Sequence, residues 1–166
     1  VGQKLRRFNP ACFISYGYAL DRFARVHLDH GIDFGDLDLK AALYIAELLP
    51  FRDSRRVIER CLGAPLASLY GCVELNAIAH TAPGGLFHVF WKNVLLEAIE
   101  REDHREVLVT ALYPRCTPLF RYRLGDAIEL GEHGVMLDGV SVISFEGILG
   151  RSNRPILLPD GGTIHS

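Results

Sequence analysis

The nonapeptide Pro118-Leu119-Phe120-Arg121-Tyr122-Arg123-Leu124-Gly125-Asp126 stands between apolar segments in the second half of the chain. Its composition predicts a strand over residues 119–123, a turn at Gly125-Asp126 and a second strand over residues 126–130. Other short segments rich in Val, Leu, Ile and Phe surround it, separated by Pro, Gly and charged turns: 86–90, 93–99, 106–112, 134–137 and 140–145. A helix is an alternative only for residues 93–100. Residues 84–166 are therefore predicted to form a β-rich subdomain, either a small barrel or an antiparallel sheet.

The polar residues of the nonapeptide allow two interpretations each. Arg121 and Arg123 alternate along one strand face, where they could bind phosphate or pair with local acids. Asp126 could accept hydrogen bonds from both hydroxyls of a ribose. It could equally bond to its own backbone, because Gly-Asp is a common turn dipeptide.

The first half of the chain alternates between two kinds of pattern. Apolar residues at helical spacing predict one amphipathic helix over residues 16–30, and a second helix begins near Asp53 or Ser54 and ends at Gly63. Short apolar stretches over residues 40–46 and 64–70 predict buried strands. Residues 1–83 are therefore predicted to be an α/β subdomain, with a mixed sheet covered by helices.

The second of the predicted strands leads into Tyr70-Gly71-Cys72-Val73-Glu74. A carboxylate at the carboxyl end of a strand lies where open α/β sheets bind ligands, and Mg²⁺ prefers such oxygen donors. The alternative for Glu74 is an N-cap or a first-turn position on a following helix. Tyr70 could lay its ring on an adenine, or it could be a core tyrosine with a satisfied hydroxyl.

A third short string, Gly150-Arg151-Ser152-Asn153, follows these motifs. Arg151 could reach a ribose or a phosphate, or it could simply solvate a turn. The sequence has no G-x-x-x-x-G-K-[ST] loop, no H-E-x-x-H pair and no G-x-S-x-G string. It therefore gives no support to a P-loop, a zinc protease site or a hydrolase triad.

Composition excludes several classes of protein. A net charge of -2 over 166 residues, with scattered Lys and Arg, gives no basic surface for nucleic acid. No apolar run approaches the length of a membrane-spanning helix, and no signal-peptide pattern begins the sequence. The four cysteines are far apart in sequence, which disfavours a zinc site and predicts a reducing, cytoplasmic setting.

Taken together, the motifs resemble those of the adenylate-forming enzymes of the acyl-CoA synthetase superfamily. The resemblance is to the phenylacetate–CoA ligase-like branch, which includes relatives associated with capsule biosynthesis. Tyr70–Glu74 matches the family's Y-G-x-T-E at Tyr, Gly and Glu, and Pro118–Asp126 is close to its Pro-Leu-Ile-Arg-Tyr-Arg-x-Gly-Asp run. The likeness extends to Tyr16-Gly17-Tyr18 and to Glu106–Thr110.

The resemblance implies a site for ATP or AMP, to which six residues contribute: Tyr70, Gly71, Glu74, Arg123, Asp126 and Arg151. In it Tyr70 packs on adenine, Asp126 holds the ribose hydroxyls, and Glu74 is the catalytic residue that serves Mg²⁺ and phosphate. The implied reaction joins ATP and a small carboxylic acid, such as an aryl or arylacetic acid, into an acyl-adenylate. The acyl group then passes to a thiol such as coenzyme A. The resemblance also implies a homodimer.

The sequence departs from the family at two positions. Val73 stands where a threonine is common, and Asn153 stands where a hinge aspartate is common. The family's phosphate loop is expected upstream of this chain and its catalytic lysine downstream. We therefore expect a fragment, the second half of a large N-terminal domain, that does not adenylate a substrate alone. The alternative is a catalytically inactive nucleotide-binding or structural module that retains the fold.

Overall fold

A computed structural model of the chain divides into two compact units, unit 1 (Val1–Gly71) and unit 2 (Cys72–Ser166). The residues that the structure describes are 1–82, 85–101, 104–113, 116–130, 135–137, 140–142, 144–152, 155–157 and 163–165. The composition and the period of the apolar residues predict a subdomain boundary between residues 83 and 84, both of which lie outside the described residues. The division between the two compact units falls within strand β3, between Gly71 and Cys72, and the predicted boundary stays a prediction.

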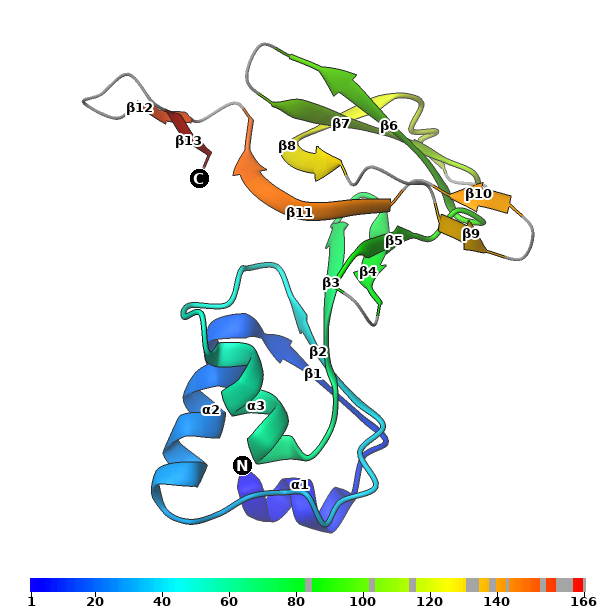
Figure 1. The fold of residues 1–166 in the computed structure, drawn as a ribbon. Coiled ribbons are helices and arrows are strands. Elements are labelled where there is room, and N and C mark those ends of the chain that lie inside the picture. Colours follow the sequence, from blue (N-terminus) through cyan, green and yellow to red (C-terminus); the bar gives the residue numbers. More distant parts are fainter. Residues whose placement is uncertain are drawn as a thin grey trace. The chain divides into compact units, whose positions relative to one another are not determined.

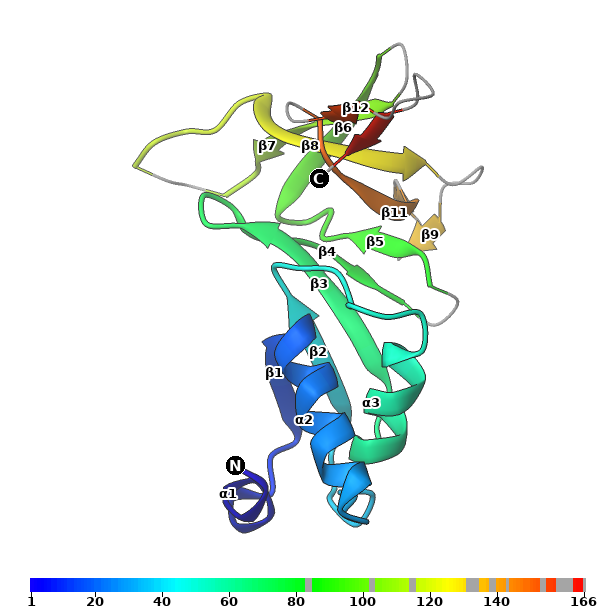
Figure 2. The same cartoon turned by 90° about the vertical axis from the view of Figure 1, so that its left-hand side faces the viewer.

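Unit 1 is built from helices and parallel strands in alternation (Figure 1). Their order is α1 (Gly2–Phe8), β1 (Cys12–Tyr16), α2 (Gly17–Asp29), β2 (Ala41–Ile45), α3 (Ser54–Leu62) and β3 (Leu66–Cys72). Strand β2 pairs in parallel with both β1 and β3. Helices α2 and α3 lie side by side in both views (Figures 1 and 2). The predicted α/β class is confirmed.

The core of unit 1 follows from the apolar faces of these elements. Leu20 and Ala24 of α2 are buried with Ile58 and Leu62 of α3, and all four pack around the side of β2 that carries Ala42. Helix α3 ends at Gly63, whose φ of +65° is a left-handed conformation that glycine adopts without a side-chain penalty. The two helices predicted from sequence thus form with nearly the predicted bounds.

One arginine ties the two helices of unit 1 together. Arg25 of α2 donates to the buried Asp21 of its own helix at 2.9 Å, and to Asp53 at the start of α3 at 2.6 Å. The hydrogen bond from Arg25 is the main cause that lowers the pKa of Asp53 below its ordinary value of 3.8. Because Asp21 is only 2% exposed, this contact keeps a buried carboxylate paired.

Unit 2 is an antiparallel sheet with the strand order β4-β5-β11-β8-β7-β6. The strands are β4 (Asn76–Thr81), β5 (Phe87–Val89), β6 (Val94–Glu100), β7 (Arg105–Ala111), β8 (Tyr122–Leu130) and β11 (Ser144–Arg151). Two short hairpins complete the described part: β9 (Val135–Leu137) with β10 (Val140–Val142), and β12 (Pro155–Leu157) with β13 (Thr163–His165). Figure 2 shows β8 between β7 and β11. The prediction of a β-rich second half is confirmed.

Three details of the predicted elements are corrected. Residues 122–130 form the single strand β8, not two strands with a turn at Gly125-Asp126, because a bulge accommodates the glycine without ending the pairing. Arg151 is the last residue of strand β11, so it does not lie in a turn. The alternative of a helix over residues 93–100 is wrong, since they form β6, paired along its length with β7. Across the described residues, no helix is both long and apolar enough to cross a membrane.

Candidate functional site

Glu74 lies in the short connection between β3 and β4, so it is neither an N-cap nor a first-turn residue of a helix. The Tyr122 hydroxyl, at the start of β8, donates a hydrogen bond of 3.0 Å to Glu74 Oε1. Three hydrogen bonds hold the pKa of Glu74 below 4.5: first from its own backbone N–H, then from the Tyr122 hydroxyl and the Cys72 thiol. The carboxylate is thus ionised and solvent-exposed, and the same hydrogen bond raises the pKa of Tyr122.

Asp126 and Arg151 face each other across neighbouring strands. They are register partners in the pairing of β8 with β11, and Arg151 Nη1 lies 3.2 Å from Asp126 Oδ1. Arg151 Nη1 also donates to the backbone carbonyl of Leu124 at 2.8 Å. The side chain of Arg151 is 57% exposed, whereas that of Asp126 is 14% exposed. The arginine thus lies on the solvent side of the carboxylate.

Strand β8 connects the two carboxylates of unit 2 that the sequence singles out, because Tyr122 at its start donates to Glu74 and Asp126 further along contacts Arg151. After the hydrogen bonds from the Glu74 backbone, the Tyr122 hydroxyl and the Cys72 thiol, the charge of Arg151 is the smallest cause that lowers the pKa of Glu74. Three of the six predicted nucleotide-binding residues therefore lie around strand β8: Asp126 within it, Arg151 as its register partner and Glu74 through the hydrogen bond from Tyr122. Tyr122, which belongs to the Pro118–Asp126 motif, joins this group.

A bulge in β8 gives Asp126 its position. In the pairing of β7 with β8, Glu106 faces Ala127 and Leu108 faces Arg123. One residue of β7 therefore lies opposite three residues of β8, Leu124 to Asp126. Gly125, in the middle of the three, has a φ of +74°, which a residue with a side chain rarely adopts.

Both arginines of the nonapeptide contact local acids, as one of the two interpretations expects. Arg121 Nε lies 3.3 Å from Glu97, an exposed pair. Arg123 donates to the buried Glu106 from Nε at 2.9 Å and from Nη2 at 2.7 Å. A role for Arg123 in nucleotide binding stays a prediction.

Tyr70 and Gly71 belong to unit 1. Tyr70 is 7% exposed, which agrees with the alternative of a core tyrosine, whereas Gly71 is exposed. The prediction that both residues contribute to an adenine site stays a prediction. Asn153, the position of the hinge aspartate in the resembled family, lies outside the described residues.

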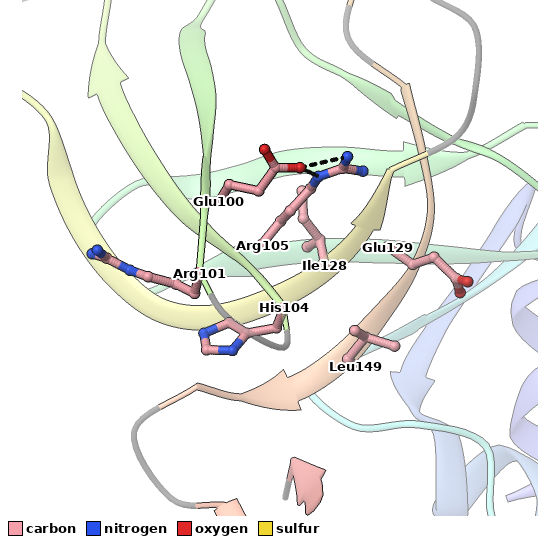
Figure 3. A pocket seen from close by; sticks show the side chains of 7 residues that line it. All are labelled: Glu100, Arg101, His104, Arg105, Ile128, Glu129 and Leu149. Carbon is pink, nitrogen blue, oxygen red and sulfur yellow. Dashed lines mark hydrogen bonds and ion pairs between the residues drawn. The ribbon is translucent and has the colours of Figure 1, made fainter.

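A pocket of about 370 Å³ lies elsewhere in unit 2. Its lining consists mainly of charged side chains from β6, β7 and the turn between them, together with residues of β8 and β11: Glu100, Arg101, His104, Arg105, Ile128, Glu129 and Leu149. Figure 3 shows the Arg105 guanidinium turned toward Glu100, to which it donates at 2.9 Å and 3.1 Å. Since these opposite charges pair with each other and no predicted site residue lines the pocket, it is a poor candidate for the nucleotide.

The carboxylate of Glu74 can supply one oxygen ligand to a hard cation such as Mg²⁺. Glu74 offers an ionised, exposed carboxylate of the kind that Mg²⁺ takes when it keeps several waters and binds substrate phosphates. Among the described residues, no three His, Cys, Asp or Glu side chains gather as a metal cage would require. Glu74 therefore fits the role of one oxygen ligand to a magnesium ion.

Two partners in this region are not predicted from the sequence, Tyr122 as a partner of Glu74 and Glu106 as a partner of Arg123. Tyr122 had a signal, since the motif places it four residues before Asp126. Glu106 had a weaker one, because it is an acid directly before the apolar run Val107–Val109. The register of β7 with β8 brings Glu106 to Arg123, and the β3–β4 connection brings Glu74 to Tyr122.

Several known proteins are similar to this chain, although no family model matches it. The relative "Protein CapK" of Staphylococcus aureus is 29% identical over 157 residues, which are 91% of this chain and 33% of that protein. A 2-hydroxyisobutyryl-CoA ligase in an open conformation, in complex with 2-HIB-AMP and CoA, superposes with a TM-score of 0.76 at 17% identity. This alignment covers 98% of this chain and 41% of the ligase.

The amide bond synthetase McbA of Marinactinospora thermotolerans superposes with a TM-score of 0.67 at 16% identity, over 99% of this chain and 36% of McbA. The chain thus spans about a third of the curated relative that it matches. The resemblance to adenylate-forming ligases is confirmed at the level of the fold, because the whole chain takes the fold of one part of these enzymes.

Proposed function

We propose that the chain carries the adenosine-binding part of an ATP-dependent, adenylate-forming ligase that activates a carboxylic acid. The observation that carries this proposal is the contact of Asp126 with Arg151 in unit 2, on strands whose fold is that of such ligases, with Glu74 hydrogen-bonded to Tyr122 of the same strand β8. Asp126 offers acceptors for sugar hydroxyls beside Arg151, a donor for phosphate.

Each residue of the group has a chemical role in the proposal. Asp126 accepts hydrogen bonds from the ribose hydroxyls, because a carboxylate has about four acceptor positions and its contact with Arg151 occupies only part of them. Arg151, which is mostly exposed, donates to phosphate oxygen. Glu74 would hold Mg²⁺, which when bound neutralises charge on the nucleotide phosphates.

The reaction belongs to the whole enzyme, of which this chain would be one part. A carboxylate oxygen of the acid attacks the α-phosphorus of ATP, and the bond to pyrophosphate breaks, which gives an acyl-adenylate. A thiol then displaces AMP from the acyl carbon. The complex of 2-hydroxyisobutyryl-CoA ligase with an acyl-AMP and CoA makes CoA a reasonable acceptor here.

Finer parts of the proposal come from the sequence motifs. We place the enzyme in the phenylacetate–CoA ligase-like branch, acting on a small acid such as an aryl or arylacetic acid in the cytoplasm, as a homodimer. The tyrosine and glycine of the first motif, Tyr70 and Gly71, would meet the adenine. Assay of the full-length parent with a panel of aryl, arylacetic and short hydroxy acids tests the acid class by release of pyrophosphate.

The nucleotide site itself is tested by calorimetric titration of the chain with AMP and Mg²⁺. We expect a Kd on the order of millimolar, or about 4 kcal/mol, because only part of a ligase site is present. Asp126→Ala should weaken binding about tenfold or more. Asp36→Ala is the matched control, because Asp36 is also an aspartate paired with an arginine, Arg6, but lies on the surface of unit 1. Equal binding by wild type and Asp126→Ala would contradict the proposal.

One observation favours a second candidate, an inactive nucleotide-binding module. Val73 is 93% exposed and offers no hydroxyl at a position where the resembled family has one. Under this candidate the chain binds AMP, but its full-length parent releases no pyrophosphate with any acid. Under the ligase proposal, pyrophosphate release depends on Asp126.

A further inference from the structure

We infer that Glu106 is a positioning residue for the nucleotide site, and that it holds the bulge of β8 in the shape that presents Asp126. The inference rests on the proposed function, since it concerns how Asp126 is placed to accept the ribose hydroxyls. Glu106 itself lies in β7 and is 2% exposed, so it does not contact a ligand directly.

Glu106 is a buried acid that two arginines satisfy. Arg123 donates to Oε1 from Nε at 2.9 Å and from Nη2 at 2.7 Å, and Arg101 donates to Oε2 from Nε at 3.0 Å and from Nη2 at 2.6 Å. Both carboxylate oxygens therefore accept a forked pair of hydrogen bonds. The arginine side chains are 42% and 66% exposed for Arg101 and Arg123, so they cover the acid on its solvent side.

The register shows what the pair with Arg123 spans. The backbone of Glu106 faces Ala127, the first residue after the bulge, whereas Arg123 is the last residue before it. The side-chain contact between Glu106 and Arg123 therefore joins the two ends of the segment Leu124 to Asp126. A clamp across three residues, one of them a glycine with positive φ, limits how that segment can rearrange.

The ion pairs persist over the physiological pH range. Burial alone would raise the pKa of Glu106, but the hydrogen bonds from Arg101 and Arg123 outweigh it and keep the pKa below 4.5. Arginine stays protonated throughout. The clamp is therefore present wherever nucleotide binding would be measured.

On the other side of the bulge, Arg151 of β11 completes the arrangement. It contacts Asp126 and the carbonyl of Leu124, which are the last and first residues of the bulged segment. Glu106 thus fixes the bulge from β7 while Arg151 fixes it from β11. Of these two, only Glu106 is too buried to touch the nucleotide, which makes it the informative one to change.

The test compares the Kd for AMP with the Kd for 2′,3′-dideoxy-AMP, which lacks both ribose hydroxyls. In the wild type we expect the dideoxy compound to bind about tenfold more weakly, as for lost hydrogen bonds to a charged group. Glu106→Gln keeps the size of the side chain but removes its charge. We expect this variant to bring the ratio close to one, as Asp126→Asn does.

A double variant separates positioning from direct contact. If Glu106 acts through Asp126, then Glu106→Gln combined with Asp126→Asn binds AMP no more weakly than Asp126→Asn alone. Glu100→Gln is the matched control, since Glu100 also pairs with an arginine of the same hairpin, Arg105, yet lies outside the bulge. It should leave the ratio unchanged.

Each result is decisive. A wild-type ratio above one that Glu106→Gln leaves intact overturns the inference while the proposed function stands. A wild-type ratio of one overturns the role of Asp126, and the inference falls with it. Should Glu106→Gln not fold, Arg123→Lys replaces it, because this exposed side chain keeps its charge but loses the fork that grips Glu106. A ratio unchanged in Arg123→Lys would then overturn the inference.

Discussion

Unit 1 and unit 2 combine the same two kinds of side chain in opposite arrangements. In unit 1 one arginine, Arg25, lies between two carboxylates, Asp21 and Asp53. In unit 2 one carboxylate, Glu106, lies between two arginines, Arg101 and Arg123. Each cluster contains one carboxylate that is almost fully buried, and in each the arginine side chains reach solvent.

The difference lies in what the two clusters join. The Arg25 cluster connects α2 to the start of α3, two regular elements whose apolar faces already pack together. The Glu106 cluster spans an irregularity in a strand, next to the carboxylate of Asp126. Similar ion pairs therefore join packed helices in one unit and, in our proposal, hold a binding conformation in the other. Changes in unit 1 should alter stability, whereas changes around β8 should alter binding.

The largest change in stability is expected from a substitution in unit 1, at Gly63. A Cβ at this position would lie 2.6 Å from the Gly35 Cα, and the φ of +65° disfavours any other residue. Gly63→Ala should lower the free energy of unfolding by about 2–4 kcal/mol, from backbone strain and overpacking together. Urea unfolding measures it, and the folded fraction should bind AMP as the wild type does.

Gly31→Ala is the control for this prediction. Gly31 has nearly the same φ, +68°, but nothing lies within 4 Å of its added Cβ. It should lose only about 1 kcal/mol, from the left-handed conformation alone. Equal losses at Gly63 and Gly31 would show that the close approach to Gly35 does not matter.

The next largest effect concerns the Arg25 cluster. Asp21→Asn removes the charged acceptor that Arg25 grips within α2, and it should lower the free energy of unfolding by about 1–2 kcal/mol. The comparison predicts no change in the ratio of AMP to dideoxy-AMP binding. An altered ratio in Asp21→Asn would break the distinction between the two units.

A smaller effect is expected at Arg151. Its ion pair with Asp126 is more than half exposed on the arginine side, so Arg151→Lys should change stability by at most about 0.5 kcal/mol. AMP binding should weaken a few-fold, because lysine does not contact Asp126 and the Leu124 carbonyl from one planar group. A large loss of stability without a change in Kd would assign Arg151 to the fold alone.

The smallest effect is a shift in one titration. Tyr122→Phe removes a hydrogen bond that lowers the pKa of Glu74, so that pKa should rise toward 4.5. Because the pKa of Glu74 is lower in the folded state, the ionised carboxylate stabilises the fold at a pH above its pKa in the unfolded chain. This stabilisation is lost as the pH falls through the pKa in the folded state. Carbon-detected NMR of the Glu74 carboxyl follows the change between pH 2 and 6. An unaltered Glu74 pKa in the variant would mean that the hydrogen bond to Tyr122 does not form.

Local patterns predict most of unit 1. The helix over residues 16–30 and the one that ends at Gly63 carry amphipathic spacing and a glycine stop, and they form as α2 and α3. Helix α1 and strand β1 carry no such signal. Helix α1 has only seven residues, too few for a periodic pattern, and one buried side chain, Leu5.

In unit 2 the same reasoning fails at the position that matters most. Gly125-Asp126 has the composition of a turn, yet it forms a bulge, because the neighbouring strands β7 and β11 continue to pair on both sides of it. The role of Glu106 depends on Arg123, seventeen residues away, and on Arg101. Periodicity in the sequence does not predict contacts between strands. The motif therefore identified Asp126, whereas the contact of Glu106 with Arg123 is visible only in the register of β7 with β8.

The most direct test of the nucleotide site is a titration of the isotope-labelled chain with AMP, followed by amide NMR. At 18.5 kDa the protein is well within the range of this measurement. We expect the largest changes in amide chemical shift at Gly125, Asp126 and Arg151, and we expect these changes to vanish in Asp126→Asn. Shifts confined to the charged pocket around Arg105, or unaffected by Asp126→Asn, would contradict the proposed nucleotide site.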